Sequence, residues 1–457
     1  MLIIISDLHL GDGTCGKSIS ASAFHLFADR LHELAMNASR RADARYEPID
    51  EIDILLLGDI LEALHSMRWL ENADGQPCSI RPWTDWHVPE FAAKLDEITT
   101  AILEKNAESI SVLRRLAGTD SLSLPPVNRS GEPDERSHRR HPVCVRIHYM
   151  IGNHDWFYHL PGAAFDHIRQ KIITAFGLSN PSVRFPHDIV EPGAGWLKTL
   201  LDRYGVFARH GDIYDGFNFL KERDAAALGD VFAVEILNRF SYEARRQFKH
   251  KLPAALIESL GELVNVRPGL ATSLWISSQL RQNNIGEPEQ EQLKELWDRL
   301  CREFLTQPLV RRMDKQFKLD MLDWFKLGIK FTDSISFKTL DELVLWLRRK
   351  FWAEEELKFS SYALKEKAFK EEAARFIVYG HTHHHEVVPL DYIPSGSQPT
   401  SQMYMNSGTW HTYFDLAINK PEEQKFVPYQ VLTYLAFFHD DERGGRRFET
   451  WSGSFSD

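Results

Sequence analysis

The chain has 457 residues, and its share of 43% hydrophobic and 26% charged residues excludes a largely disordered protein. Its formal net charge of −11 is the wrong sign for a protein coated in nucleic acid, although a local basic groove is compatible with it. The four cysteines lie far apart without a Cys-x-x-Cys pair, which excludes a disulfide framework and a thiolate zinc site and favours a reducing compartment.

The first half of the chain reads as strands alternating with helices. A short, β-branched apolar run predicts a buried strand over residues 2–5, followed by the polar, glycine-containing loop of residues 6–16. Apolar side chains at spacings of three and four predict a helix around residues 24–34. A second buried strand is expected over residues 52–57. Residues 89–117 have the pattern of one long amphipathic helix, with a proline in its first turn and a glycine as its stop.

Residues 118–142 contain four prolines and a charged tract, so we expect an exposed loop there. Each of the next three predicted strands runs into a polar group that includes a glycine and at least one histidine. These strands are expected over residues 143–151, 206–209 and 376–379. Strand-like runs follow at residues 403–405 and 426–437.

The length of the chain predicts two or three domains, or one large domain that carries an insertion. Strands that alternate with helices predict an α/β protein built around sheets. Residues 213–375 interrupt this alternation because they read almost entirely as helix. We therefore interpret them as a helical cap inserted into one core, whose two parts are residues 1–212 and 376–457.

The ends of five predicted strands carry Asp, His or Asn beside a small or turn-forming residue. Ligands bind at the carboxyl ends of strands in open α/β sheets, so these side chains are expected to meet at one edge. The candidates are Asp7, His9, Asp59, Asn153, His210, His381 and His383. Imidazole, carboxylate and amide groups without a thiolate suit Mn²⁺, Fe²⁺, Zn²⁺, Co²⁺ or Ni²⁺. Seven ligands exceed what one ion with open positions needs, so we predict two ions bridged by Asp59, an arrangement suited to displacement at phosphorus.

The same residues also occur in an ordered set of motifs. These are Asp7-Leu8-His9, Gly58-Asp59, Gly152-Asn153-His154-Asp155, His210 after a strand, and Gly380-His381-Thr382-His383. This set resembles the calcineurin-like metallophosphoesterase superfamily. The resemblance implies a two-sheet β-sandwich flanked by helices, and a metal-dependent hydrolase of phosphate esters or pyrophosphate bonds.

The resemblance also implies a role for each residue. One ion would be held by Asp7, His9 and His383, and the other by Asn153, His210 and His381. Asp59 would bridge both ions together with the attacking hydroxide; Mn²⁺ is the first choice, and Fe, Zn, Co and Ni are alternatives. His154 would protonate the leaving oxygen or stabilise the phosphoryl charge. We add the hypothesis that Asp155 orients the His154 imidazole, since a positioned base usually has a third partner.

Each candidate also has an ordinary interpretation. The chain contains 20 histidines, and a single one is more often hydrogen-bonded or on the surface than a metal ligand. Gly58-Asp59 is an everyday turn. The ordinary interpretation is plausible for any one motif but not for all five together, because five independent turns would all have to carry metal-type side chains. Arg209 precedes His210 and is a candidate substrate contact, although it could equally balance the charge of nearby acidic groups.

Residues 309–376 are rich in aromatic side chains and carry a small excess of Lys and Arg. They predict a helical subdomain with its own core, or else a basic-rimmed apolar cap over a phosphorylated lipid or a membrane surface. UDP-2,3-diacylglucosamine pyrophosphatases, one branch of the superfamily, also insert helices at this place, and the phrases ISDLHLGDG and LLGDILEAL are similar to theirs. The present insertion is longer, and His154 stands where that branch has Arg.

We therefore expect an enzyme that acts on a phosphorylated substrate. The closest alternative is a nuclease, with a basic groove that includes Arg136, Arg139 and Arg140. A non-catalytic scaffold that binds a partner through the cap is the alternative outside the enzymes. No apolar run approaches the roughly 18 residues that span a bilayer, and the first residues lack the basic start of a signal peptide, so we expect a cytoplasmic protein.

Overall fold

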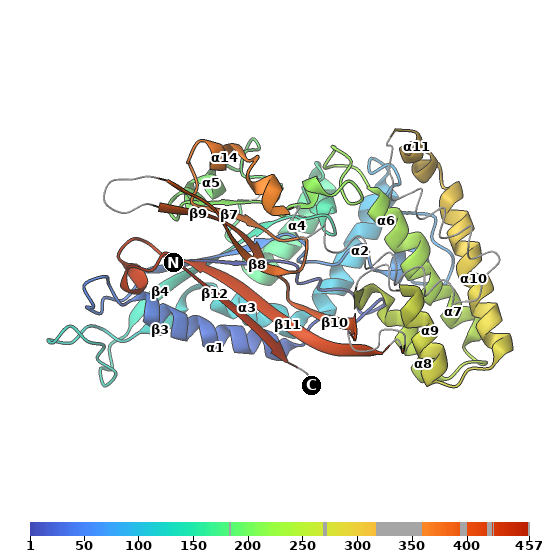
Figure 1. Cartoon of the computed structure of the whole chain (residues 1–457), viewed down its shortest axis with the longest axis horizontal. Helices are drawn as coiled ribbons and strands as arrows, with labels where there is room; N and C mark the ends of the chain where they lie inside the picture. Colours follow the sequence, from blue (N-terminus) through green and yellow to red (C-terminus); the bar gives the residue numbers. More distant parts are fainter. Residues whose placement is uncertain are drawn as a thin grey trace.

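The computed structural model describes the chain except for residues 182–183, 268–271, 317–358, 394–399, 418–422, 424 and 456–457. The described residues form a mixed α/β fold with two mixed β-sheets that are flanked by helices (Figure 1). Most of the aromatic residues predicted to cap the site, from Phe317 to Trp352, lie outside the described residues.

The larger sheet contains the parallel strands that position the first half of the candidate site. Its order is β3 (Gly118–Leu124), β4 (His141–Met150), β2 (Glu51–Leu57), β1 (Leu2–Ile5), β11 (Phe426–Phe437), β10 (His411–Leu416) and β6 (Val266–Arg267), and β12 (Phe448–Phe455) also pairs with β11. Strands β1, β2 and β4 are parallel neighbours, so their carboxyl ends lie at one edge. All four residues of β1 are buried, as expected for an apolar strand covered on both faces.

The smaller sheet packs against the larger one. It consists of β5 (Val206–Ala208), β7 (Phe376–Tyr379), β9 (Thr400–Ser407) and β8 (His385–Ile393), in this order. A buried apolar layer joins the two sheets, with Leu2 and Leu55 contributed by the larger sheet and Ile377 and Tyr404 by the smaller one. Strands β5 and β7 are parallel, so their carboxyl ends lie at one edge of the smaller sheet. This edge carries the second half of the candidate site.

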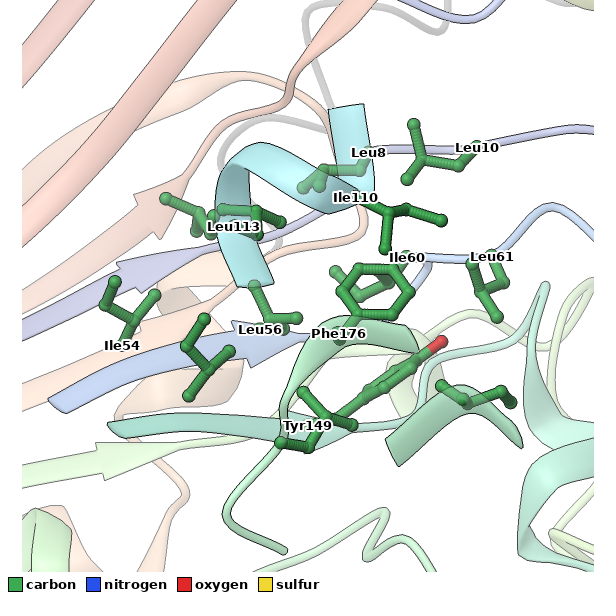
Figure 2. Close-up of a cluster of buried hydrophobic side chains, with 14 of the residues drawn as sticks. Leu8, Leu10, Ile54, Leu56, Ile60, Leu61, Ile110, Leu113, Tyr149 and Phe176 are labelled. Atoms are coloured by element: carbon green, nitrogen blue, oxygen red, sulfur yellow. The ribbon is translucent and has the colours of Figure 1, made fainter. Parts of the chain in front are cut away.

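Four helices cover the opposite face of the larger sheet. They are α1 (Ala21–Ala38), α2 (Pro89–Lys105), α3 (Ala107–Leu116) and α4 (Ala163–Phe176). Their apolar faces enclose a second buried cluster, in which Ile110, Leu113 and Phe176 meet Ile54 and Leu56 of the sheet (Figure 2). The short helices α5 (Gly195–Asp202) and α14 (Lys367–Lys370) lie beside the smaller sheet (Figure 1).

Residues 228–316, within the predicted insertion, form a separate group of helices at one end of the molecule, on the right of Figure 1. The α-helices of this group are α6 (Leu228–Phe232), α7 (Arg239–Phe248), α8 (Ala254–Leu260), α9 (Thr272–Gln282), α10 (Glu287–Thr306) and α11 (Pro308–Gln316), and a π-helical turn (Ala233–Asn238) joins α6 to α7. These helices bury their own apolar cluster, which includes Phe240, Trp297 and Phe304. Single turns of 3₁₀-helix occur at Met67–Trp69, Trp156–His159, Asp212–Tyr214, Gly261–Asn265 and Glu442–Gly445.

The predicted strands are present, with ends that shift by a few residues, and three expectations need correction. The long helix over residues 89–117 is two helices, because Asn106 ends α2. The predicted loop over residues 118–142 begins with β3, an edge strand antiparallel to β4, whose Leu122 and Leu124 are buried. The prolines that indicated a loop all follow this strand. Within the insertion, β6 is not helical, because it pairs in parallel with β10 at the edge of the larger sheet.

None of the helices in the described residues combines the length and the apolar character that crossing a membrane requires.

Candidate metal centre

Residues from the ends of β1, β2 and β7 form the first group of candidate ligands. Asp7, His9, Asp59 and His383 each place one ligand atom within 4.8 Å of the others. Nε2 of His383 lies 3.1 Å from Oδ1 of Asp7 and 3.1 Å from Nε2 of His9. Nε2 of His9 is 3.9 Å from Oδ2 of Asp59. Two carboxylates and two imidazoles therefore face one small space.

A second group shares Asp59 with the first. Asp59, His210 and His381 also place one ligand atom each within 4.8 Å of one another, and Nε2 of His210 is 3.1 Å from Oδ2 of Asp59. The side-chain oxygen of Asn153 lies 3.2 Å from Nε2 of His210 and 3.0 Å from Nδ1 of His381. All seven predicted ligands thus lie together, in two sets that have Asp59 in common.

Apolar neighbours of the candidate ligands are anchored in the core. Leu8 and Leu10 enter the apolar cluster under the helices, and so do Ile60 and Leu61 after β2 (Figure 2). The polar residues beside them, Asp7, His9 and Asp59, face the candidate site instead. Five of the seven candidate ligands adopt positive φ values, between 44° and 68°: Asp7, His9, Asp59, His381 and His383. Such conformations cost of order 1–3 kcal/mol each and concentrate at functional sites, where the surrounding packing enforces them.

Two glycines in the motifs are required by close approach to the ligands. A Cβ atom on Gly152 would lie 2.3 Å from Oδ1 of Asp59 and 2.7 Å from Nε2 of His210. A Cβ atom on Gly380 would lie 2.7 Å from Oδ2 of Asp7. Real Cβ atoms do not make contacts this short, so a larger residue at either position would force the ligands or the backbone to shift.

Each of the four candidate histidine ligands has its second ring nitrogen held by a partner. Nδ1 of His9 lies 2.7 Å from the Glu62 carboxylate, and Nδ1 of His383 lies 2.6 Å from the Tyr413 hydroxyl. Nδ1 of His210 is 3.0 Å from the Leu57 carbonyl oxygen, and Nε2 of His381 is 3.1 Å from the Asp215 carboxylate. The remaining nitrogen of each ring faces the cluster. Metal-bound histidines have this arrangement, because the outer partner fixes the orientation and tautomer of the ring.

The chemistry of the cluster fits divalent ions. Among the described residues, the buried Oδ1 of Asp7 has no hydrogen-bond donor in good geometry, which is costly for a carboxylate unless a cation neutralises it. Burial lowers the pKa of His383 to about 3, so its imidazole is neutral and able to donate a lone pair. Burial would also lower the pKa of His210, but Asp59 and Asp7 raise it to about 10, which reflects the negative charge concentrated here.

His154 lies beside the cluster and is paired with a residue that the sequence analysis did not select. Its Nδ1 is 2.7 Å from a carboxylate oxygen of Glu62, and its backbone N–H donates to Oδ1 of Asp59 over 2.8 Å. Burial would lower the pKa of His154, but Glu62 and Asp59 raise it to about 9. The protonated imidazole is therefore the favoured form near neutral pH, which suits a proton donor.

Asp155 does not orient His154, contrary to our hypothesis. Its carboxylate accepts hydrogen bonds from the backbone N–H groups of Ile60 and Gly152 and from the Tyr149 hydroxyl, over 2.9, 2.6 and 2.5 Å. These bonds tie the loop after β2 to the loop after β4. Burial, reinforced by the charge of Asp59, raises the pKa of Asp155 to about 6. Asp155 therefore shapes the backbone on which His154 and Asp59 are placed.

Arg209 does not face the cluster either. Its guanidinium pairs with Asp188 over 3.1 Å and with Glu366 over 3.3 Å, and it lies over the Phe207 ring. Adjacent residues of a strand point to opposite sides, so the orientation of His210 toward the ligands sends Arg209 away from them. Of the two interpretations of Arg209, the balance of local charge fits the structure.

A small pocket adjoins the first ligand group. It is lined by His9, Gly11, Cys15, Gly16, Lys17, Ser18, Glu62, His65, His154, Val264, Asn265, Arg267 and His411. Arg267 lies over the Tyr413 ring, and its Nη2 is 3.5 Å from Nδ1 of His383. The sequence analysis missed Glu62, although it stands only three residues after Asp59. No sequence motif indicated that Arg267 lies at the site, because only the pairing of β6 with β10 brings it here.

Comparisons with known proteins leave the family open. Neither a scan against protein-family models nor a search of curated proteins found a match for this chain.

Proposed function

We propose that this protein is a phosphoesterase that uses two divalent metal ions, and that its core is a two-sheet sandwich of the metallophosphoesterase type. The observation that carries the proposal is the orientation of His9, His210, His381 and His383. Each directs one ring nitrogen at a shared space while a second partner holds the other. A dinuclear site requires imidazoles that are held in this way, and it requires a carboxylate that both groups share.

Two divalent ions held there would act as Lewis acids toward a phosphoryl group and lower the pKa of water. The protein's own residues supply the remaining functions. His154, kept protonated by Glu62, would donate a proton to the leaving oxygen. Asp155 would keep the two loops in register, so that His154 and the ligands maintain their separation.

The lining of the adjoining pocket supports an anionic substrate. Lys17 and Arg267 bring positive charge to a space bordered by His9 and His154. Arg267 belongs to the insertion, which thereby takes part in binding the substrate as well as covering it. A phosphate ester or a pyrophosphate that approaches the centre from this side would match the positive charge of Lys17 and Arg267.

A nuclease receives less support. The exposed Arg136, Arg139 and Arg140 precede the amino end of β4, whereas Asn153 and His154 follow its carboxyl end. The ten residues of β4 separate the two places by roughly 30 Å. These arginines therefore do not form a basic groove next to the candidate centre.

The test is an assay of Mn²⁺-loaded protein with metal content measured on the same sample. Three substrates would be compared: a bis-aryl phosphodiester, an aryl phosphate monoester and a lipid-linked nucleotide pyrophosphate. We expect two ions per chain and metal-dependent hydrolysis of at least one substrate. The variant Asp59→Asn should lose both ions and the activity, whereas Asp29→Asn, a change at an exposed residue of α1, should keep both.

The outcomes distinguish the alternatives. Preference for the pyrophosphate would make the insertion a pocket for a lipid-linked substrate. Two bound ions without turnover of any substrate would favour the non-catalytic scaffold, and the absence of bound metal would contradict the proposal altogether.

A further inference from the structure

A second cluster of metal-type side chains lies outside the centre described above. His159 ends the 3₁₀ turn that follows the Gly152–Asp155 motif, and His187 and Glu191 belong to the segment that leads into α5. One ligand atom from each of these three residues lies within 4.8 Å of the other two. The side chains are mostly covered but keep exposed fractions of 10% for His159, 24% for His187 and 14% for Glu191, so the cluster is open to solvent on one side.

The Glu191 carboxylate lies between the two imidazoles. Its Oε2 is 2.5 Å from Nδ1 of His187 and 3.4 Å from Nε2 of His159. A tetrahedral ion with ligand bonds of about 2.1 Å separates its ligand atoms by about 3.4 Å. The His159–Glu191 distance already has this value, and His187 would have to move by about 1 Å. Nδ1 of His187 faces the Glu191 carboxylate directly, so this nitrogen is directed at the space that an ion would occupy.

An additional carboxylate holds the far side of His159. Oδ1 of Asp224 is 2.5 Å from Nδ1 of His159, which leaves Nε2 to face Glu191 and His187. In zinc sites a metal-bound histidine commonly has its second ring nitrogen hydrogen-bonded to a carboxylate. This hydrogen bond fixes the tautomer that binds the ion. Asp224 is also 3.6 Å from Arg184, so its position is restrained from two sides.

The charges of the cluster favour a cation. The Glu191 carboxylate contacts both imidazoles, and the Asp224 carboxylate contacts His159 from its far side. Two carboxylates therefore surround a pair of imidazoles. A divalent ion would neutralise them without requiring either histidine to carry a proton.

We propose that His159, Glu191 and His187 form a third metal site, specific for a Zn²⁺-type ion, with Asp224 as the outer partner of His159. Two histidines and one glutamate form a ligand set that zinc uses in proteins, and it leaves one position for water or an exogenous ligand. The site connects the inserted segment, through Asp224, to the core beside the Gly152–Asp155 motif. An ion there would fasten the start of the insertion to the loop that carries His154. This proposal does not depend on the phosphoesterase assignment.

The experiment uses the full chain with the first centre disabled by Asp59→Asn and His210→Gln. After chelation to remove metal, this background variant would be titrated with Co²⁺, whose visible absorption reports coordination by protein ligands. Zn²⁺ would then be added in competition. We expect one Co²⁺ per chain, displaced by Zn²⁺. Adding His187→Gln should weaken Co²⁺ binding by at least tenfold, and Asp224→Asn should weaken it about 10- to 100-fold while it retains the absorption of the bound ion.

His167→Gln, at an exposed histidine of α4, is the matched control and should bind Co²⁺ like the background variant. Glu191→Gln repeats the test if His187→Gln does not fold, as judged by circular dichroism. A background variant that binds no Co²⁺ would overturn the proposal. So would folded His187→Gln and Glu191→Gln variants that bind Co²⁺ as tightly as the background.

Discussion

At the scale of single residues, the candidate centre depends on conformations that an unconstrained chain avoids. Five of the ten described non-glycine residues with positive φ are candidate ligands. Buried neighbours such as Leu8 and Ile60 enforce these conformations, because their side chains are anchored in the core below (Figure 2). The free-energy cost of these conformations is thus accepted in order to place polar side chains, which is the pattern of a functional site.

The first prediction concerns His154, which contacts Glu62 and follows the candidate ligand Asn153. His154→Ala should keep both metal ions, because the imidazole is not among the ligand groups around Asp59. Turnover should fall by about 10²- to 10⁴-fold through loss of the proton donor. Metal analysis and steady-state kinetics on one sample would measure both quantities. His25→Ala, at an exposed residue of α1, serves as the control, and full activity of His154→Ala would contradict the role.

A second prediction concerns Gly152, whose Cβ position is already occupied by Asp59 and His210. Gly152→Ala should displace these ligands by about 1 Å, reduce the metal content from two ions per chain to one or none, and lower activity at least ~10²-fold. Gly195→Ala at the start of α5 is the matched control, because its Cβ would meet no atom within 4 Å. Equal metal content in the two variants would show that the close approach is relieved by backbone movement.

At the scale of elements, parallel pairing places the ligands and a buried ion network braces the strands that carry them. Asp53 of β2 is fully buried and lies 2.8 Å from Nε of Arg146 and 2.9 Å from Nε2 of His148, both on β4. Nη2 of Arg203, which follows α5, is 3.1 Å from the same carboxylate. The network holds β2 beside β4 and thereby keeps Asp59 beside Asn153.

The third prediction follows from the charge of Asp53. Burial would raise its pKa, but hydrogen bonds from His148 and Arg146 lower it below its usual value. The carboxylate therefore stabilises the fold above the unfolded-state pKa of about 3.9, and this contribution is lost as the pH falls through the lower folded-state pKa. Asp53→Asn should cost about 3 kcal/mol of unfolding free energy at neutral pH.

Urea unfolding of the wild type and of Asp53→Asn would measure this difference at several pH values. The gap should be constant from neutral pH down to about 5 and should shrink below about 4. Asp29→Asn, with an exposed carboxyl group on α1, should differ little from the wild type at any pH. A gap that widens on acidification would contradict the assigned sign.

At the scale of the whole molecule, the insertion and the core share the candidate site. The cap helices have their own apolar cluster, yet β6 leaves them to join the edge of the larger sheet. This pairing carries Asn265 and Arg267 to the pocket beside His9. Residues 265–267 of the predicted insertion therefore bring a positive charge to the candidate site.

The fourth prediction tests this contribution. Arg267→Ala should raise KM for an anionic substrate by about tenfold to a hundredfold, the effect of losing a hydrogen bond to a charged group, while kcat and the metal content change little. Arg281→Ala, at an exposed position of α9, is the control and should leave KM unchanged. A fall in kcat at constant KM would instead mean that Arg267 acts on the reacting groups or on His383.

The sequence by itself determined which side chains end the strands. Asp7, Asp59 and Asn153 follow apolar runs that predict buried strands, and parallel strands that share a sheet end at one edge. The convergence of these three residues was therefore predictable from residue types and order, whereas the histidines after β5 and β7 come from the second sheet, which packs against the first. The mixed α/β class was predictable for the same reason.

The tertiary structure alone decided the partners of those side chains. Glu62 rather than Asp155 pairs with His154, Arg209 turns toward Asp188, and Arg267 reaches the pocket only because β6 joins β10. Strand β3 likewise exists through its pairing with β4, while the prolines next to it indicated a loop. Local periodicity specifies which face of an element is apolar. It contains no information about which distant residue lies across a hydrogen bond, because that choice is made when separate elements pack together.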